Sequence, residues 1–435
     1  MAADRILYAV DPLGCFGAPA QNDGRAEHRI LKILEWIPHL KRLGITDVLF
    51  HPVFESGSHG YDIRAFAQTD CRLGTNEDFA EVCRSLHENG IGVLLDAVFN
   101  HVGRDFPPFQ NVRQKKQNSP YRDWFFLNFN DTWAPDGFTY GNWEGDNTFV
   151  KLNLKNPEVI SVLFSAAEFW IREFQIDGIR LANACCMDRE FLSALADHLH
   201  AIRPDLFLLG EMNGGDCRLL IEECHLDCVT NREGRDRLCS SLNYEDLSDI
   251  GWLLNDPSGF RKEALSACSF LLNYVDSHDT SRIAGVLKNP CDLPLAYDLL
   301  YAMPGIPCIY CGSEWGMKGM RTKDSDSAVR PEIAAPEWNS LCDHIALLSA
   351  LRRSFPVFSR GDYRPVSVSG DLLAFTRTLP DETLLFVLNR SDQETVFTPE
   401  GTWPVMEDLC TKEKTDPSCG IRLKPKSSVF LHHYA

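Results

Sequence analysis

Carboxylate, imidazole and guanidinium groups follow several short apolar stretches of this sequence. Such groups can exchange protons with a polar substrate or hold charge close to it. A charged side chain directly after an apolar stretch is costly to bury unless it is paired or in use. Any one of them alone could form a structural ion pair, but their convergence from different stretches favours a functional site. They are Asp96, Asn100, His101, Arg180, Glu211, His278 and Asp279.

The spacing of these groups predicts the elements that carry them. Arg180 and Glu211 are 31 positions apart, which is one strand–helix unit, and Asp279 follows 68 positions after Glu211, which is two units. Short apolar strands that alternate with helices pair in parallel, and eight of them close into a barrel with its functional groups at the C-terminal strand ends. We therefore predict a (β/α)8 TIM barrel, an α/β fold, with strands at 6–11, 46–55, 91–101, 177–183, 206–213, 226–232, 271–279 and 306–314.

Two further segments interrupt or follow the barrel. The 84 positions between Asp96 and Arg180 are too many for one unit, which predicts an insertion after the third strand. After a closing helix within 337–355, the pattern changes to alternating strands of an antiparallel β-sandwich. The predicted units are a barrel of residues 1–101 and 156–355, an inserted domain B of residues 102–155, and a C-terminal β-domain of residues 356–435.

Local sequence patterns predict the boundaries of two helices. Thr75 and Asp78 form a capping-box pattern that predicts the start of a helix, with Gly90 as its stop. An earlier apolar stretch ends at Gly44, and Pro38 is expected to kink or divide it.

Composition narrows the class of partner. The formal net charge of −18 over 435 residues repels polyanions and anionic lipid surfaces, so we expect neither a nucleic acid nor a membrane partner. A small neutral or polar substrate fits better. The N-terminus lacks the pattern of a secretory signal, so we expect a cytoplasmic protein. Its 16 cysteines are then interpreted as free thiols, and their spacing matches no common zinc site.

Ordered motifs along residues 1–355 resemble those of the α-amylase family of glycoside hydrolases. As a set, in this order and at these spacings, they are highly specific, and the family also has an insertion after the third strand and a C-terminal β-domain. The motifs are HGYD (59–62), DAVFNH (96–101), DGIRLA (177–182), LLGEM (208–212), SHD (277–279) and PGIPCIYCGSEWG (304–316).

The resemblance implies a role for each site residue. Retaining glycosidases use two carboxyl groups, one that protonates the leaving oxygen and one that attacks the anomeric carbon. Glu211 corresponds to the acid/base, Asp279 to the carboxylate that stabilises the transition state, and Arg180 to the residue that orients the nucleophile. The expected sugar-binding residues are Tyr61, Asp62, Asp96, His101, Arg180 and His278.

The family's nucleophilic aspartate is absent. Its position, two residues after Arg180, holds Ala182. Either the nucleophile was removed deliberately to trap a substrate, or the chain is a natural pseudoenzyme that binds a sugar or a protein partner without turnover. The survival of Glu211, which a binding protein does not need, favours the first. The resemblance then implies a retaining hydrolase or transglycosidase of short α-glucosides such as maltodextrins, inactive in this chain.

Several properties stay open in the sequence. Asn183 and Ser277 replace residues that are common in the family, which leaves the linkage preference open, and the choice between hydrolysis and transfer and the oligomeric state are open too. No cofactor is expected; Asn100 matches a ligand position of calcium-dependent members, but it can equally be a hydrogen-bonding strand end. The aromatic side chains of the insertion either form its core or stack on sugars; they are Trp124, Phe125, Phe126, Trp133, Phe138, Tyr140 and Trp143.

Overall fold

The computed structural model describes residues 2–244, 246–255, 271–323 and 325–434. Its centre is a closed barrel of eight parallel strands in the order β1-β13-β12-β11-β10-β9-β3-β2. The predicted TIM barrel is confirmed, and each predicted strand range contains one barrel strand. The barrel strands are β1 (Leu7–Val10), β2 (Asp47–Phe50), β3 (Gly92–Ala97), β9 (Gly178–Leu181), β10 (Phe207–Gly210), β11 (Cys228–Thr230), β12 (Leu271–Tyr274) and β13 (Ile306–Tyr310).

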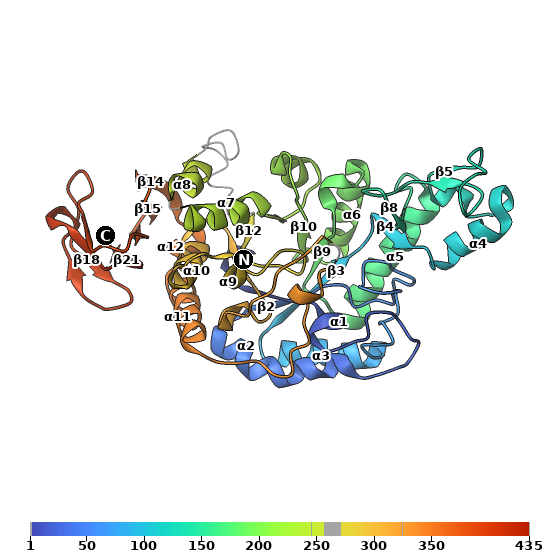
Figure 1. The fold of residues 1–435 in the computed structure, drawn as a ribbon, viewed down its shortest axis with the longest axis horizontal. Coiled ribbons are helices and arrows are strands. Elements are labelled where there is room, and N and C mark those ends of the chain that lie inside the picture. Colours follow the sequence, from blue (N-terminus) through green and yellow to red (C-terminus); the bar gives the residue numbers. More distant parts are fainter. Residues whose placement is uncertain (1, 245, 256–270, 324, 435) are drawn as a thin grey trace.

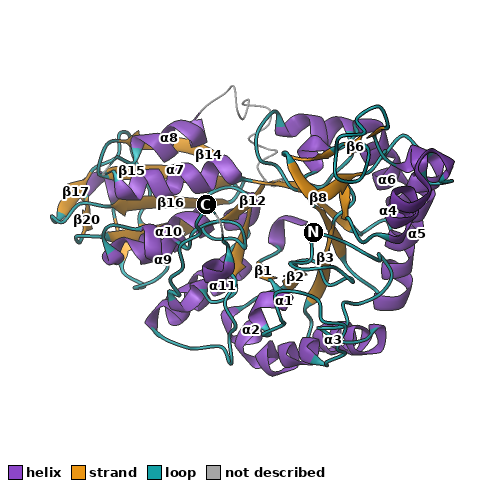
Figure 2. Ribbon diagram, turned by 45° about the vertical axis from the view of Figure 1, so that its right-hand side comes forward, coloured by secondary structure: helices purple, strands orange, loops and turns teal. Residues whose placement is uncertain are grey.

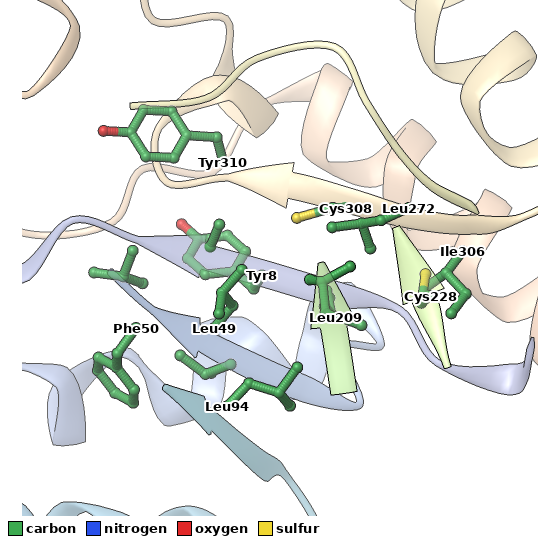
Figure 3. Close-up of a cluster of buried hydrophobic side chains, with 14 of the residues drawn as sticks. Tyr8, Leu49, Phe50, Leu94, Leu209, Cys228, Leu272, Ile306, Cys308 and Tyr310 are labelled. Carbon is green, nitrogen blue, oxygen red and sulfur yellow. The ribbon is translucent and has the colours of Figure 1, made fainter. Parts of the chain in front are cut away.

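Apolar side chains fill the interior of the barrel (Figure 3). Leu49, Leu94, Leu209 and Leu272 come from four different strands, and each is at most 3% exposed. Parallel strands covered on both faces are apolar at nearly every position, which is the pattern that the sequence has. The barrel is therefore a packed core and the polar groups are confined to its ends.

Helices surround the barrel (Figure 2). The division expected near Pro38 is present, because a 3-10 segment, η2 (Arg29–Trp36), leads into α2, and Gly44 ends that helix at φ 80°. The capping box of α3 is also present, with Thr75 and Asp78 bonded reciprocally. The helices are α1 (Pro12–Cys15), α2 (Ile37–Leu43), α3 (Asn76–Glu88), α4 (Pro107–Lys115), α5 (Pro157–Phe174), α6 (Arg189–Ile202), α7 (Arg232–Asn243), α8 (Ser248–Asn255), α9 (Ile283–Val286), α10 (Leu293–Ala302), α11 (Ser340–Ser354) and α12 (Val357–Arg360).

The third predicted strand is shorter than expected. β3 ends at Ala97, and His101 begins a separate strand that pairs antiparallel with β8 in the inserted segment. The chain therefore leaves the barrel after Ala97, which places the carboxylate of Asp96, the residue before it, at the barrel mouth. The strands of the insertion are β4 (His101–Gly103), β5 (Leu127–Asn128), β6 (Thr139–Tyr140), β7 (Asn142–Trp143) and β8 (Asp146–Lys151).

The aromatic side chains of the insertion divide between its core and its surface. Phe125, Phe138 and Tyr140 surround Phe109 of α4, with ring centroids 5.0–6.2 Å from it. Trp133, by contrast, is 79% exposed. In Figure 1 this segment, marked by α4 and β5, lies at the opposite end of the molecule from the C-terminal sheet.

The C-terminal segment folds as an antiparallel six-stranded sheet in the order β14-β15-β16-β21-β18-β19, with a two-stranded sheet β17-β20 beside it. Successive side chains of a strand point to opposite faces. Phe375 and Phe386 face the barrel and belong to its core, whereas Leu385 packs in a second cluster with Ile421 of the small sheet. The strands are β14 (Asp362–Val368), β15 (Leu372–Leu379), β16 (Glu382–Asn389), β17 (Thr395–Phe397), β18 (Met406–Asp408), β19 (Lys414–Thr415), β20 (Ile421–Leu423) and β21 (Ser427–Tyr434).

Within the described part of the chain, none of the helices combines the length and the apolar character needed to span a bilayer.

Candidate active site

The predicted polar residues come together at the C-terminal ends of the barrel strands. Asp96 lies near the end of β3 and Arg180 on β9, while Glu211 directly follows β10. Tyr61 and His278 come from the loops after β2 and β12 and are hydrogen-bonded to one another. Side chains that are far apart in the sequence thus meet in one cluster, as the barrel geometry requires.

Arg180 forms the centre of the charged network. Its guanidinium lies 2.5 Å from Asp96 Oδ2 and 3.0 Å from Glu211 Oε1. Burial by itself would lower the pKa of Arg180, but the two carboxylates hold that pKa well above its ordinary value. Burial likewise would raise the pKa of Asp96, but Arg180 and a hydrogen bond with His51 hold it below its ordinary value. The pair is therefore ionised at neutral pH.

Glu211 is held on both carboxylate oxygens. Oε1 faces Arg180, and Oε2 accepts a hydrogen bond of 2.7 Å from the backbone N–H of Asn183. Asn183 has the left-handed conformation, with φ 56°, which turns the chain sharply after β9. Ala182, between Asn183 and the strand, is fully buried and brings no functional group to the site.

A stacked pair of rings adjoins this network. The rings of Tyr61 and His278 lie 5.4 Å apart at 12°, and Tyr61 Oη is 2.7 Å from His278 Nε2. The same hydroxyl donates to Asp96 Oδ2 at 2.9 Å. Burial, reinforced by the neighbouring His51 and by the positive charge of Arg330, holds the pKa of His278 well below its ordinary value, so the His278 ring is neutral. Neutral rings beside an ionised carboxylate are suited to stacking on sugar faces and bonding hydroxyls.

Asp279 lies at the edge of the cluster. Its carboxylate accepts a hydrogen bond from the hydroxyl of Ser277 and lies 3.6 Å from Arg232 Nη1. Burial raises its pKa, but the Ser277 hydrogen bond and the charges of Arg232 and Arg180 lower it further, so the balance is below the ordinary value. Asp279 is therefore an anion at neutral pH.

His101 lies on the side of the inserted segment. Its ring stacks on Trp143 at 5.9 Å and 24°. Burial lowers the pKa of His101 to about 4. Two aromatic residues of the insertion therefore contact this site residue, because the ring of Phe149 also lies 4.7 Å from that of His101.

Buried polar atoms without a partner mark the mouth of the barrel. Asp96 Oδ1, His101 Nε2 and His278 Nδ1 each lack a hydrogen bond within the described residues. Buried polar groups are nearly always hydrogen-bonded in folded proteins, so three unpaired atoms at one strand-end region indicate a place where a polar ligand completes the set.

Asp62 points elsewhere. Its carboxylate accepts hydrogen bonds from the backbone N–H and the hydroxyl of Ser58, at 3.1 and 3.0 Å. In this structure it closes the loop that carries Tyr61.

Asn100 is the residue that matches a calcium-ligand position. Asn100 offers one unpaired buried amide oxygen, whereas calcium takes six to eight oxygen ligands. Among the described residues, the single cluster of three metal-ligating side chains is Glu55, Asp70 and Cys71. Its carboxylates are already occupied, because Asp70 pairs with Arg72 through both oxygens and Glu55 accepts from the Cys71 N–H.

Three contributors to the site were missed in the sequence. His51 follows β2 and bonds Asp96 at 3.1 Å, and Arg232 follows β11, so both obey the strand-end rule that found the others. Arg330 lies in the long loop after β13, where it donates to the backbone oxygen of His278 at 3.0 Å, and no local pattern signals it.

A pocket of about 770 Å³ begins next to the acid/base position, at Met212. The loop after β10, beginning at Met212, forms one wall, and Thr230, Asn231 and Arg232 after β11 form another. Arg232 links this pocket to Asp279.

Two curated relatives are similar to this chain in sequence. A maltogenic α-amylase of Bacillus acidopullulyticus is 31% identical over 412 residues, which cover 92% of this chain and 69% of that protein. A cyclomaltodextrinase of Geobacillus thermopakistaniensis is 31% identical over 370 residues, covering 83% of this chain and 62% of the relative. The chain thus spans about two thirds of the length of these relatives.

Solved structures give the same picture. A cyclomaltodextrinase structure superimposes with a TM-score of 0.85 at 26% identity and covers all of this chain and 77% of that one. The sequence model of the α-amylase catalytic domain matches residues 30–344, which includes all the barrel-mouth residues described above. The chain therefore belongs to the α-amylase family of glycoside hydrolases.

Proposed function

We propose that the barrel mouth binds short α-glucans such as maltodextrins and that the chain does not turn them over by the retaining route. One observation carries this proposal: Glu211 is present and held by Arg180, while the nucleophile position holds a buried alanine, Ala182. Retaining cleavage needs two carboxyl groups about 5–5.5 Å apart, one of which must attack the anomeric carbon. A methyl group has no lone pair to offer.

Each remaining residue then has a definable task. Glu211 would protonate the leaving glycosidic oxygen, and Asp279 would grip sugar hydroxyls beside the cationic transition state. The stacked ring of Tyr61 would support a sugar face, and His101 and His278 would bond hydroxyls through their unpaired nitrogens.

The names of the relatives support a maltodextrin-like ligand. The two relatives compared by sequence are a maltogenic α-amylase and a cyclomaltodextrinase, and this chain covers 69% and 62% of their lengths. The Ala182→Asp variant is compatible with hydrolysis and with transfer, because both reactions begin with the same glycosyl-enzyme.

Two measurements test the proposal. Calorimetric titration of the chain with maltose, maltotriose and a cyclomaltodextrin should detect binding without product formation. Ala182→Asp should then create α-glucosidase activity on at least one of these sugars, raised on the order of 10³-fold or more over the parent chain. Ala182→Asn is the matched control, since it has nearly the same size but no nucleophile. Adding Glu211→Gln to Ala182→Asp should remove the gained activity.

A second candidate is a natural pseudoenzyme that binds sugar or a protein partner. The hydrogen bond from Asn183 N–H favours it, because together with the Arg180 contact it engages both oxygens of Glu211 within the protein. Sugar binding combined with an inert Ala182→Asp form would support this candidate. Absence of sugar binding in both forms would contradict the proposed function.

We further propose a cytoplasmic location. The 15 cysteines within the described residues are all free thiols, which suits a reducing compartment. A relative of Bacillus subtilis, 27% identical over 367 residues, is named an intracellular maltogenic amylase. Cell fractionation with antibody detection tests the location, and recovery in the secreted fraction would contradict it.

A further inference from the structure

Cys185 and Cys186 form an accessible pair of thiols close to Glu211. They lie in the short 3-10 turn η5 (Ala184–Cys186) between β9 and α6. Their sulfur atoms are 3.8 Å apart, Cys186 is exposed and Cys185 is partly exposed. The proposed function gives neither thiol a task.

The distance between the two sulfurs suits chelation. Two sulfur ligands about 2.3 Å from one central atom are about 3.8 Å apart at a tetrahedral angle and about 3.5 Å apart at the angle of about 100° of a pyramidal centre. The two sulfurs therefore need to approach only slightly to bind one pyramidal atom together.

The number of available side chains limits which kind of ligand the two thiols can bind. Among the described residues, neither cysteine belongs to a cluster of three metal-ligating side chains. A structural zinc ion needs four ligands and is poorly served by two. A monosubstituted trivalent arsenical needs two thiols only, because its third bond is to its own carbon.

Backbone hydrogen bonds tie this turn to the sugar site. The N–H of Cys185 donates to the carbonyl oxygen of Glu211 at 3.3 Å, and the N–H of Cys186 donates to that of Asn183 at 2.9 Å. Asn183 in turn donates to the Glu211 carboxylate. A ligand that pulls the two sulfurs together strains the same turn that positions Glu211.

We propose that Cys185 and Cys186 form a bidentate binding site for trivalent organoarsenicals and that its occupation weakens oligosaccharide binding at Glu211. The reaction is a condensation without electron transfer. Two S–As bonds form, the As–O bond breaks, and the two thiol protons leave with the oxide oxygen as one water. No oxidant is required. The second thiol binds intramolecularly, which makes the adduct far tighter than that of a single thiol.

The thiols do not need to be reactive nucleophiles for this. Burial, reinforced by the neighbouring Cys185, raises the pKa of Cys186 to about 11, so the Cys186 thiol is protonated at neutral pH. Alkylation of Cys186 by iodoacetamide should accordingly be slow, whereas condensation with an arsenic oxide carries the thiol protons away in the water formed.

Intact-mass spectrometry of the full chain with phenylarsine oxide tests the site. One phenylarsenic group should add per chain, survive excess 2-mercaptoethanol and be removed by dithiothreitol. Cys185→Ser and Cys186→Ser should each weaken the adduct on the order of 100-fold, since each leaves a single thiol. Cys291→Ser, which removes another exposed thiol, is the matched control and should change nothing.

Survival of the tight adduct in either single variant would overturn the assignment and place it on other thiols. Cys185→Ala gives the same reading if the serine variant unfolds. The second arm compares maltotriose affinity with and without the arsenical; this arm rests on the proposed function, but the mass measurement does not. Unchanged affinity in a sugar-binding protein would overturn the coupling, whereas absence of any sugar binding would contradict the proposed function and leave the dithiol result standing.

Discussion

The guanidinium of Arg180 pairs with the carboxylate of Glu211, with 3.0 Å between Nη2 and Oε1. The resemblance to the family predicts that this arginine orients a nucleophile, and Ala182 leaves it without that partner. Arg180 instead lies between Asp96 and Glu211, and one cation compensates two buried or half-buried anions. The stability of the barrel mouth and its chemistry therefore depend on the same side chain.

Arg180→Met should destabilise the protein strongly. Removing one partner of a buried ion pair leaves an uncompensated charge and costs about 3–5 kcal/mol. We expect that loss in the free energy of unfolding, measured by urea denaturation. Adding Asp96→Asn should recover part of it, because the orphaned carboxylate is then neutral. Arg172→Met, at a residue whose side chain is 70% exposed, is the control and should cost less than about 0.5 kcal/mol. Equal losses in the two variants would contradict the central role of Arg180.

Tyr61 should act through its ring more than through its hydroxyl. Tyr61→Phe keeps the stacked face and loses the hydrogen bonds with Asp96 and His278. We expect maltotriose affinity to fall only a few-fold in that variant and by roughly tenfold or more in Tyr61→Ala, which removes an aromatic contact worth about 0.5–1.5 kcal/mol beyond its buried area. Calorimetric titration measures both. If the two variants bind equally, the ring does not contact the sugar.

His101 should make stability depend on pH in a defined window. Its pKa is about 4 in the folded protein, below the ordinary 6.5. The unfolded chain therefore binds more protons between these values, so the free energy of unfolding decreases as pH falls from 6.5 towards 4. The full contribution is about 3 kcal/mol. His101→Gln should flatten this part of the profile, measured by urea denaturation at several pH values. A His101→Gln profile as steep as that of the parent would refute the assignment.

Substitution of Asp62 tests whether its carboxylate closes the loop that carries Tyr61 or contacts the sugar. Because its carboxylate accepts from the N–H and the hydroxyl of Ser58, Asp62→Ala should lower stability by about 1–2 kcal/mol. Ser58→Ala removes one of the same bonds and should reproduce part of that loss. If Asp62→Ala instead weakened sugar binding at unchanged stability, the carboxylate would be a sugar ligand after all.

The barrel was predictable because its signals are local and repeat. Apolar strands such as 206–213 recur at the spacing of strand–helix units, and a barrel forces their ends into one region. The convergence of Asp96, Arg180 and Glu211 follows from that geometry alone. The same rule reaches His51 and Arg232, which also follow strands.

What escaped prediction depends on contacts between distant loops. Arg330 reaches His278 from a loop after the last barrel strand, and nothing in its neighbourhood requires that contact. The third strand was predicted through His101, but pairing of His101 with Lys151 in the insertion ends it at Ala97. Hydrophobic periodicity predicts that a segment forms a strand, but it does not predict in which of two sheets that strand pairs.

The inner face of the C-terminal sheet shares the core of the barrel through Phe375, Phe386 and Phe430. The C-terminal segment has only a small apolar cluster of its own, around Leu385 and Ile421, so the sheet and the barrel each cover apolar surface that the other would expose to water. Loss of the sheet would expose a broad apolar surface on the barrel, and exposed apolar surfaces drive aggregation of partly folded chains. In a thermal melt the barrel and the C-terminal sheet should unfold in one cooperative transition. A substitution that destabilises a C-terminal strand should therefore also destabilise the barrel mouth, where the sugar is expected to bind.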